Sequence, residues 1–310
     1  MTTNKPYTPV MTLIVDSGST KTTWACIHTP DAPTEEAHQQ PITHYTTSLG
    51  INPIRDKEES ILQAVRKGTD ALFQSLREEG LCDVPSRAVR RIFFYGAGCI
   101  PPYSTTVRNI LHDLFPLASI QVESDMAGAA LALCGHQEGI ACILGTGSNS
   151  CLFDGESIVE QTPALGFILG DEGSGASLGK RLVGDVLKKQ LPAELREAFF
   201  QETGLSQPEI INRVYRQPQP NMFLASLTPF LERHLDHKDV RTLVIDEFRR
   251  FLQRNIRAYQ RPDLPVHFVG GITATYQEEL KQALEMEGLH MGKILSRPIQ
   301  GMVEYHLACK

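Results

Sequence analysis

Two segments about 130 residues apart share one design, and this repeat limits the folds that the chain can adopt. Residues 12–27 and 140–155 each consist of an apolar run of strand length, a tight turn of glycines and small hydroxyl residues, and a second apolar run. Glycine lets the backbone pass close to a ligand, while adjacent N–H groups and hydroxyls donate hydrogen bonds to anionic oxygens. One such turn is an ordinary hairpin. Two turns with matching chemistry predict a pair of clamps on a polyphosphate.

The order of the expected elements also repeats. The first half reads as three strands that form an antiparallel meander and then a helix, a strand, a helix, a strand and an Ala-rich helix. The meander strands are at residues 12–16, 22–27 and 42–47, and the other elements are at residues 56–79, 91–95, 107–115, 120–125 and 126–134. Three strands begin again at Ile140, which indicates a second copy of the arrangement.

The second half is longer because it contains additional helices. These are expected at residues 174–190, 194–203, 209–215, 222–234 and 240–259, before a strand at 266–269, a helix at 275–287 and a short helix in the tail. We therefore expect an α/β protein of two domains with the ligand between them. The first domain covers residues 1–120 and is joined by the terminal segment 297–310, and the second covers residues 121–296 with the helical insertions.

Composition narrows the class of function. A net charge of −6 and a pI near 5.9 argue against a nucleic-acid binder that neutralises phosphates. Seven cysteines without a C-x-x-C pair are typical of small buried thiols in a reducing cytosol. The first ten residues lack the apolar core of a signal peptide, and no apolar run is long enough to cross a membrane. We expect a soluble, cytoplasmic protein without a nucleic-acid or membrane partner.

The first turn, Asp16-Ser-Gly-Ser-Thr-Lys21, begins with a carboxylate at the end of an apolar strand, where α/β proteins bind ligands. Beside glycine and hydroxyl groups, this carboxylate suits a Mg²⁺ ion that keeps much of its hydration. The alternative is an Asx-type hairpin turn. The segment is not a P-loop, because G-x-x-x-x-G-K-[ST] is absent and a strand follows rather than a helix.

Three further glycine-rich turns follow apolar segments. Gly145-Thr-Gly-Ser-Asn149 repeats the chemistry of the first turn and has the same hairpin alternative. Gly170-Asp-Glu-Gly-Ser-Gly175 opens a helix, whose N-terminus favours an anionic group, although Asp171 is alternatively an ordinary acidic residue at a helix start. Gly270-Gly271 fits a flat ring lying against bare backbone, or a simple β–α turn.

Asp125 is the candidate catalytic residue. Phosphoryl transfer to an alcohol needs a carboxylate that accepts the hydroxyl proton, together with cations and N–H donors on the moving phosphate. Asp125 lies between the two clamps in sequence, after a strand and before a helix. Its alternative role is an N-cap, and Glu123 is a rival base at an interior strand position. The absence of H-E-x-x-H and G-x-S-x-G argues against metal-dependent and serine hydrolases.

These motifs resemble those of the BadF/BadG/BcrA/BcrD-type ATPase family of the actin/hexokinase/Hsp70 superfamily, in the group that includes N-acetylglucosamine kinase. Matching segments, in the family's order, are Asp16-Ser-Gly-Ser-Thr-Lys-Thr, Ser124-Asp-Met-Ala-Gly, Leu144-Gly-Thr-Gly-Ser-Asn, Leu169-Gly-Asp-Glu-Gly-Ser, Val269-Gly-Gly and the terminal Arg297-Pro-Ile-Gln-Gly-Met-Val. The resemblance implies a duplicated ribonuclease-H-like, actin/hexokinase-type fold with an interdomain cleft. It also implies ATP and Mg²⁺ as cofactors.

The resemblance also implies a role for each matching position. Asp125 resembles the base at the sugar hydroxyl, and Asp16 resembles the residue beside the metal. The ATP phosphates would contact Gly18, Ser19, Thr20, Lys21, Gly145, Thr146 and Gly147, with Gly270 and Gly271 on the adenosine side. The sugar would contact Asp125 and also Asn52, Ser148, Leu165, Gly166 and Asp171.

One departure concerns the substrate. Where animal kinases have Gly-Trp-Gly, this chain has Ala164-Leu165-Gly166, so the acetamide pocket is expected to differ. The resemblance nonetheless implies a kinase of amino sugar metabolism that transfers the γ-phosphate of ATP to the 6-hydroxyl of N-acetylglucosamine or a related amino sugar. A homodimer is compatible with this assignment.

Two alternatives follow from the same superfamily. An ATPase that activates a dehydratase needs cysteines for an iron–sulfur cluster, and Cys99, Cys134, Cys142 and Cys151 do not match that pattern. A sugar-binding regulator without kinase activity is expected to carry an additional helix-turn-helix, whereas only about eleven residues precede the first strand. The presence of both Asp16 and Asp125 also argues against an idle site.

Overall fold

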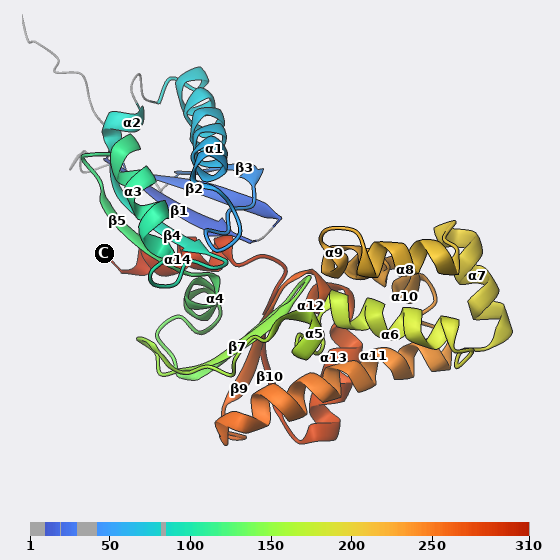
Figure 1. Cartoon of the computed structure of the whole chain (residues 1–310). Coiled ribbons are helices and arrows are strands. Elements are labelled where there is room, and N and C mark those ends of the chain that lie inside the picture. Colours follow the sequence, from blue (N-terminus) through green and yellow to red (C-terminus); the bar gives the residue numbers. More distant parts are fainter. Residues whose placement is uncertain (1–9, 19, 30–41, 82–84, 310) are drawn as a thin grey trace, which may run out of the picture. The chain divides into compact units, whose positions relative to one another are not determined.

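The chain forms two compact units in the computed structural model, which describes residues 10–18, 20–29, 42–81 and 85–309 (Figure 1). The first unit comprises Met1–Ala132 and Pro298–Lys310, and the second comprises Leu133–Arg297. The sequence prediction placed the boundary at residue 120. The structure assigns the last strand of the first sheet and most of the Ala-rich helix to the first unit.

The sheet of the first unit has the strand order β3-β2-β1-β4-β5. Its strands are β1 (Val10–Ser17), β2 (Lys21–Thr29), β3 (Ile42–Leu49), β4 (Val89–Gly96) and β5 (Ser119–Ser124). The first three pair antiparallel, which confirms the expected meander, and β4 and β5 continue the sheet parallel to β1.

Helices cover both faces of this sheet (Figure 1). They are α1 (Glu58–Glu78), α2 (Pro85–Ala88), α3 (Ser104–Leu114), α4 (Asp125–Cys134) and α14 (Ile299–Ala308). Leu13 and Val15 of β1 belong to the apolar core that includes α1 and α3, whereas the neighbouring Ile14 is buried on the opposite face, since successive side chains of a strand alternate. Because both faces are covered, residues 11–15 are all buried, and all of them except Thr12 are apolar.

The sheet of the second unit repeats this topology with the order β10-β9-β6-β7-β8. Its strands are β6 (Gly139–Leu144), β7 (Ser148–Phe153), β8 (Ile158–Glu160), β9 (Pro265–Val269) and β10 (His290–Leu295). Again three strands form an antiparallel meander and two are added parallel to the first of them. The sequence did not predict β10. The repeated topology confirms the expected duplicated, ribonuclease-H-like α/β fold.

The helices of the second unit pack around an extensive apolar core. They are α5 (Gly166–Leu169), α6 (Gly175–Leu187), α7 (Ala193–Thr203), α8 (Gln207–Tyr215), α9 (Pro220–Ala225), α10 (Thr228–Arg233), α11 (Lys238–Phe251), α12 (Gly271–Thr275) and α13 (Gln277–Glu287). In the described part of the chain, no helix combines the length and apolar character of a membrane span.

Two long helices expected from the sequence are interrupted in the structure. The segment 222–234 is divided into α9 and α10, and Pro229 lies in the first turn of α10, where its missing N–H costs no hydrogen bond. The segment 240–259 begins as α11 and continues as a π-helix, η1 (Leu252–Ile256), and a 3₁₀ turn, η2 (Arg257–Tyr259). The apolar spacing of this segment is that of one continuous α-helix, so the sequence did not predict the change of helix type.

Five cysteines are buried, namely Cys26, Cys99, Cys134, Cys142 and Cys151, whereas Cys309 is exposed and Cys82 lies outside the described residues. Burial raises the pKa of the Cys134 and Cys151 thiols to about 12. A thiol in that state is a poor nucleophile and a poor metal ligand. The buried thiols therefore behave as small apolar side chains, as their placement in apolar runs indicates.

Candidate functional site

The candidate catalytic residues lie where the parallel strands of the first unit end. Ser17 of β1, Gly96 of β4 and Ser124 of β5 form one row across the sheet. Asp16 comes immediately before this row, and Asp125 immediately after it. The register therefore brings both carboxylates to the carboxyl edge of the sheet, at which α/β proteins bind ligands.

The two carboxylates influence each other. Burial and the negative charge of Asp125 raise the pKa of Asp16 to about 7. Burial also raises the pKa of Asp125 to about 6, although hydrogen bonds from its own backbone N–H and that of Met126 lower it. Desolvation and a like charge both disfavour ionisation. The pair would be stabilised by a nearby cation.

The alternative roles proposed for Asp125 and Glu123 are distinguished by their contacts. Ser124 Oγ accepts a hydrogen bond from Ala127 N at 3.2 Å, so Ser124 provides the cap that Asp125 was alternatively expected to provide. Glu123 accepts from the side chain of Gln121, and its charge adds to the burial that raises the pKa of Tyr95. Of the two acidic residues, Asp125 is the one whose charge acts on Asp16.

The first turn is tied to the segment that carries Asn52. Gly18 N donates to Lys21 O at 3.0 Å and closes the hairpin, and Gly50 N donates to Thr20 O at 3.0 Å. Thr20 and Lys21 are exposed. Ser19, the remaining predicted contact in this turn, lies outside the described residues.

Two buried hydroxyls, which sequence reasoning missed, connect strands β1 and β2 to the segment that precedes Asn52. Ser17 Oγ and Thr22 Oγ1 lie 2.7 Å apart, and Ile51 N donates to Ser17 Oγ at 3.0 Å while Thr22 Oγ1 donates to Leu49 O at 2.8 Å. Asn52 lies next in the chain, and its Oδ1 accepts from Ile54 N at 3.1 Å. Hydroxyl residues at inward-facing positions of two apolar strands were the signal that could have revealed this link.

The second turn and the Gly170–Gly175 segment form one structure. Gly145 N donates to Gly147 O at 2.9 Å, and the first amides of α6, Gly175 N and Ala176 N, donate to Gly145 O at 2.8 Å and to Thr146 O at 3.1 Å. Ser174 caps the same helix through Ser177 N. The N-terminus of α6 therefore holds the turn in place. The expectation that this helix end attracts an anion has to be corrected, because its leading amides already have acceptors.

Asp171 is not the acidic helix-start residue that was its alternative role, because α6 begins at Gly175 with Ser174 as its cap. Its Oδ1 accepts from Ser148 N at 3.2 Å, and a side chain at Gly147 would come within 3.1 Å of its Oδ2. Burial raises the pKa of Asp171, and the hydrogen bond from Ser148 opposes this rise. The structure thus brings together Asp171, Ser148 and Gly147 from two separate predicted segments.

Gly270 and Gly271 differ in their surroundings. Gly270 has φ of 133°, and a Cβ there would lie 2.2 Å from Leu144 O, so only glycine allows the turn after β9 to approach the end of β6. Gly271 begins α12, is exposed, and has open space around the position of a Cβ. Gly270 thus makes the simple β–α turn that was the structural alternative, and Gly271 leaves room beside this turn.

A pocket of about 350 Å³ in the second unit contains several predicted sugar contacts. Ser148, Leu165 and Asp171 line it, whereas Gly166, the first residue of the short helix α5, is not among the lining residues. The other lining residues, which the predictions did not name, are Asn149, Thr162, Pro163, Ala164, Leu169, Gly170, Glu172, Arg254 and Asn255.

The pocket has a polar wall and an apolar wall. Asn149 Oδ1 accepts from Gln161 Nε2 and from Ser150 N, each at 3.0 Å, which leaves the Asn149 amide nitrogen as a donor for a ligand. Asp171 and Glu172 add carboxylates, and Leu165 and Leu169 add exposed apolar surface. This arrangement suits a small molecule with a hydroxyl-bearing edge and an apolar substituent.

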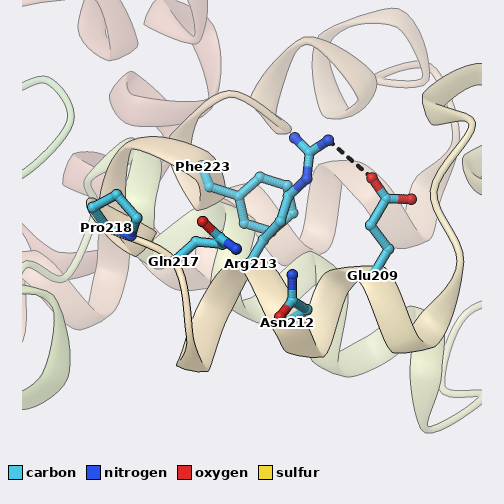
Figure 2. A pocket seen from close by; sticks show the side chains of 6 residues that line it. All are labelled: Glu209, Asn212, Arg213, Gln217, Pro218 and Phe223. Atoms are coloured by element: carbon cyan, nitrogen blue, oxygen red, sulfur yellow. Dashed lines mark hydrogen bonds and ion pairs between the residues drawn. The ribbon is translucent and has the colours of Figure 1, made fainter.

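The second unit also has a larger pocket, of about 490 Å³, whose lining includes none of the predicted site residues. Figure 2 shows the side chains that line it. It is lined by Glu209, Asn212, Arg213, Gln217, Pro218 and Phe223. Arg213 pairs with Glu209 at 2.9 Å and lies 5.2 Å from the centre of the Phe223 ring. Because the arginine is already paired and stacked, this pocket presents no uncompensated charged group. Size alone does not make it the functional site.

The carboxylates of the first unit fit a hydrated magnesium ion better than a closed metal site. In residues 10–18, 20–29, 42–81 and 85–309, no three His, Cys, Asp or Glu side chains group in a way that could hold a metal. Mg²⁺ usually keeps several waters and binds through one or two carboxylates together with substrate phosphates. Asp16, buried beside another acid, is the residue that such an ion would stabilise.

Comparison with known structures agrees with the fold described above. The chain matches no family model and no curated protein. A crystal structure from Porphyromonas gingivalis, named "Putative N-acetylglucosamine Kinase", is 43% identical with a TM-score of 0.85 and covers 96% of this chain and 98% of its own. A protein with the same name from Chromobacterium violaceum has a TM-score of 0.73 at 19% identity, covering 96% and 99%, and shows the fold.

An identity of 43% over nearly the full length of both chains is sufficient to show that the two proteins belong to the same family. The motifs quoted above and the duplicated topology agree with it. The chain belongs to the N-acetylglucosamine kinase-like group of the BadF/BadG/BcrA/BcrD-type ATPase family, within the actin/hexokinase/Hsp70 superfamily.

Proposed function

We propose that this protein is an ATP-dependent kinase that phosphorylates the 6-hydroxyl of N-acetylglucosamine or a related amino sugar. The observation that carries the proposal is the pair Asp16 and Asp125 at the carboxyl edge of the first sheet, where burial raises both pKa values. The name of the Porphyromonas gingivalis relative supports the same substrate.

Asp125 is the proposed general base. Its pKa of about 6 leaves it ionised at pH 7 and more basic than an ordinary carboxylate, which favours transfer of a hydroxyl proton. As the sugar oxygen bonds to the γ-phosphorus, Asp125 accepts the proton of the hydroxyl. The bond between this phosphorus and the bridging oxygen breaks, and ADP leaves with the electron pair.

The nucleotide is proposed to contact the two glycine-rich turns. The hydroxyls of Thr20 and Thr146, and the backbone amides of the two turns that do not close a hairpin, would donate to its phosphates. The open space beside Gly271 would accommodate the adenosine. Asp16 would hold Mg²⁺ through water, which supplies charge neutralisation on the phosphates.

The pocket of the second unit is the proposed sugar site. Asn149 and Asp171 would bind sugar hydroxyls, and the apolar wall at Leu165 and Leu169 would contact the N-acyl group. Asn52 of the first unit is the remaining proposed sugar contact. An amino sugar carries both a hydroxyl-bearing edge and an apolar acyl group, which matches the two walls.

Sugar-dependent release of ADP tests the proposal. A coupled assay with a panel of amino sugars and hexoses should show ADP release that depends on an amino sugar. Asp125→Asn should lower turnover by about 10²- to 10⁴-fold, the usual contribution of a general base, while calorimetry shows ATP affinity nearly unchanged.

Glu123→Gln is the matched control and should retain turnover, since the charge of Glu123 acts on Tyr95. Turnover of Asp125→Asn near the wild-type rate would contradict the assignment of the base. ADP release that is equally fast without any sugar would contradict the kinase function itself and favour an ATPase.

A further inference from the structure

Asp171 has a backbone conformation that needs support from its surroundings. Its φ is 58°, in the left-handed region. For a residue with a Cβ this conformation costs about 1–2 kcal/mol, and it persists where neighbouring contacts determine it. Ser174 N donates to Asp171 O at 3.1 Å and closes the turn. The two intervening residues, Glu172 and Gly173, are both bound by the helical rod formed by α11 and η1.

Glu247 of α11 is the first of these supports. Its side chain is completely buried, which is unusual for a carboxylate unless hydrogen-bond donors and cations surround it. Ser177 Oγ donates to it at 2.5 Å, Gly173 N at 3.4 Å and Arg250 Nη1 at 2.9 Å. One buried carboxylate thus joins the Asp171 loop, helix α6 and helix α11.

Arg254 of η1 is the second support. Its Nε lies 2.5 Å from Glu172 Oε1, and both residues line the sugar pocket. Arg254 belongs to the π-helical turn Leu252–Ile256, together with Asn255, which also lines the pocket. π-Helical turns inside longer helices occur frequently at functional sites, because the extra residue redirects the side chains that follow.

We propose that Glu247 and Arg254 are positioning residues that hold the Asp171 loop in its sugar-binding conformation. They would set the affinity for the sugar, whereas the affinity for ATP would be nearly independent of them. The inference rests on the proposed sugar kinase function and assigns to the α11–η1 rod a role in substrate recognition.

The chain contains a matched control, a buried carboxylate of another helix that binds side chains of the same rod. Glu287 is a nearly buried carboxylate at the end of α13, 8% exposed, that accepts from Arg249 at 2.9 Å, Gln253 at 2.7 Å and Arg257 at 2.9 Å. It resembles Glu247 in burial, but its hydrogen-bond partners, Arg249, Gln253 and Arg257, belong neither to the Asp171 loop nor to the pocket lining. A purely structural effect of losing a buried acid should therefore appear in both Glu247→Gln and Glu287→Gln.

The first measurement is the kinetics of purified variants. Glu247→Gln should raise KM for the sugar about tenfold or more, because small displacements of positioned groups have effects of this size, while KM for ATP changes less than about twofold. Glu287→Gln should leave both constants near wild type. Arg254→Met should raise KM for the sugar in the same way, and Arg254→Lys should recover part of the loss. Equal rises in KM for sugar and ATP, or equal effects in both glutamate variants, would overturn the proposal.

The second measurement does not depend on activity. Hydrogen exchange of the peptide that covers residues 170–175, in the ligand-free protein, should be faster in Glu247→Gln and Arg254→Met than in wild type and Glu287→Gln. Unchanged exchange in both loop variants would overturn the inference. If wild-type protein phosphorylates no sugar, the proposed function fails, and exchange still decides whether these residues position the loop. If Glu247→Gln does not fold, Arg254→Met decides, since its side chain is 59% exposed.

Discussion

His306 offers a prediction whose size follows from the structure. Its Nε2 lies 2.9 Å from Tyr95 Oη, and its ring stacks on Phe93 with centroids 3.9 Å apart. Burial, together with the positive charge of Arg91, lowers the pKa of His306 from 6.5 to about 4. The helix α14 that carries it packs on the first sheet, so protonation of the imidazole is coupled to the folding of the first unit.

The sign follows from which state binds more protons. Between pH 4 and 6.5 the unfolded chain binds a proton at His306 and the folded protein does not. The contribution of the neutral imidazole is therefore complete above pH 6.5 and is lost as the pH falls toward 4. The shift from 6.5 to about 4 corresponds to a maximum of about 3.4 kcal/mol. At pH 5 the loss relative to pH 8 is about 2 kcal/mol by the same relation.

Asp16 and Asp125 titrate in the opposite sense, because their folded pKa values are raised above the ordinary value of 3.8. The pH dependence of the wild-type unfolding free energy therefore does not show the contribution of His306 by itself. His306→Phe keeps a ring against Phe93 and removes the titrating group. Subtracting the unfolding free energy of this variant from that of wild type cancels the two carboxylates, so the difference should fall by about 2 kcal/mol between pH 8 and pH 5.

Trp24, the single tryptophan of the chain, makes the measurement specific to the first unit. It is completely buried in β2, so its fluorescence during urea unfolding reports on this unit. His112→Gln, at a histidine whose side chain is 68% exposed, is the control for the removal of a histidine as such. A wild-type minus His306→Phe difference that is constant between pH 8 and pH 5 would refute the reasoning.

Three further predictions concern the two candidate sites. In the ADP-release assay, kcat/KM should fall as the pH decreases below about 7, because Asp16 must be ionised to hold Mg²⁺ and Asp125 must be ionised to accept the hydroxyl proton. A flat profile between pH 8 and pH 5 would exclude both roles. Gly270→Ala should lower the unfolding free energy of the second unit by about 2 kcal/mol or more, because a φ of 133° and the contact of a Cβ with Leu144 O are both unfavourable. Far-UV circular dichroism in urea measures this change. Ser17→Ala removes the hydroxyl that holds the Asn52 segment, so it should lower the free energy of unfolding by about 1–3 kcal/mol. It should also raise KM for the sugar more than KM for ATP. An unchanged KM for the sugar would show that this link is dispensable.

Sequence patterns predicted the elements whose cause is local. The apolar strands and the Gly-rich turns at Gly18 and Gly145 carry their own signals, and the repeated topology followed from them. The pattern failed where tertiary contacts decide. Strand β10, His290–Leu295, contains glycine, lysine and histidine, and it forms because β9 offers a parallel edge. Helix α3 begins at Ser104, three residues before the expected start, since its apolar pattern begins only at Val107.

The same distinction applies to the candidate sites. Asp16 and Asp125 were proposed from the sequence because Asp16 ends an apolar strand and Asp125 lies between a strand and a helix. The parallel register then places both at the same edge of the sheet. Arg254 and Asn255 were missed, since they lie in a segment whose apolar spacing reads as one uninterrupted helix. A π-helical turn keeps the chain helical while shifting the following side chains by about one position, which is invisible to a periodicity argument.

The Asp171 loop shows why the second unit needs its helical insertions. The turn of Gly145–Gly147 alone would be a hairpin, held by one hydrogen bond between Gly145 N and Gly147 O. Helix α6 fixes it from one side by directing its first amides at the turn, and α11 fixes the following loop through Glu247. The hairpin thereby becomes part of a defined pocket. If the proposed sugar site is correct, variation in α11 and η1 changes the pocket while leaving the two glycine-rich turns of the sequence intact.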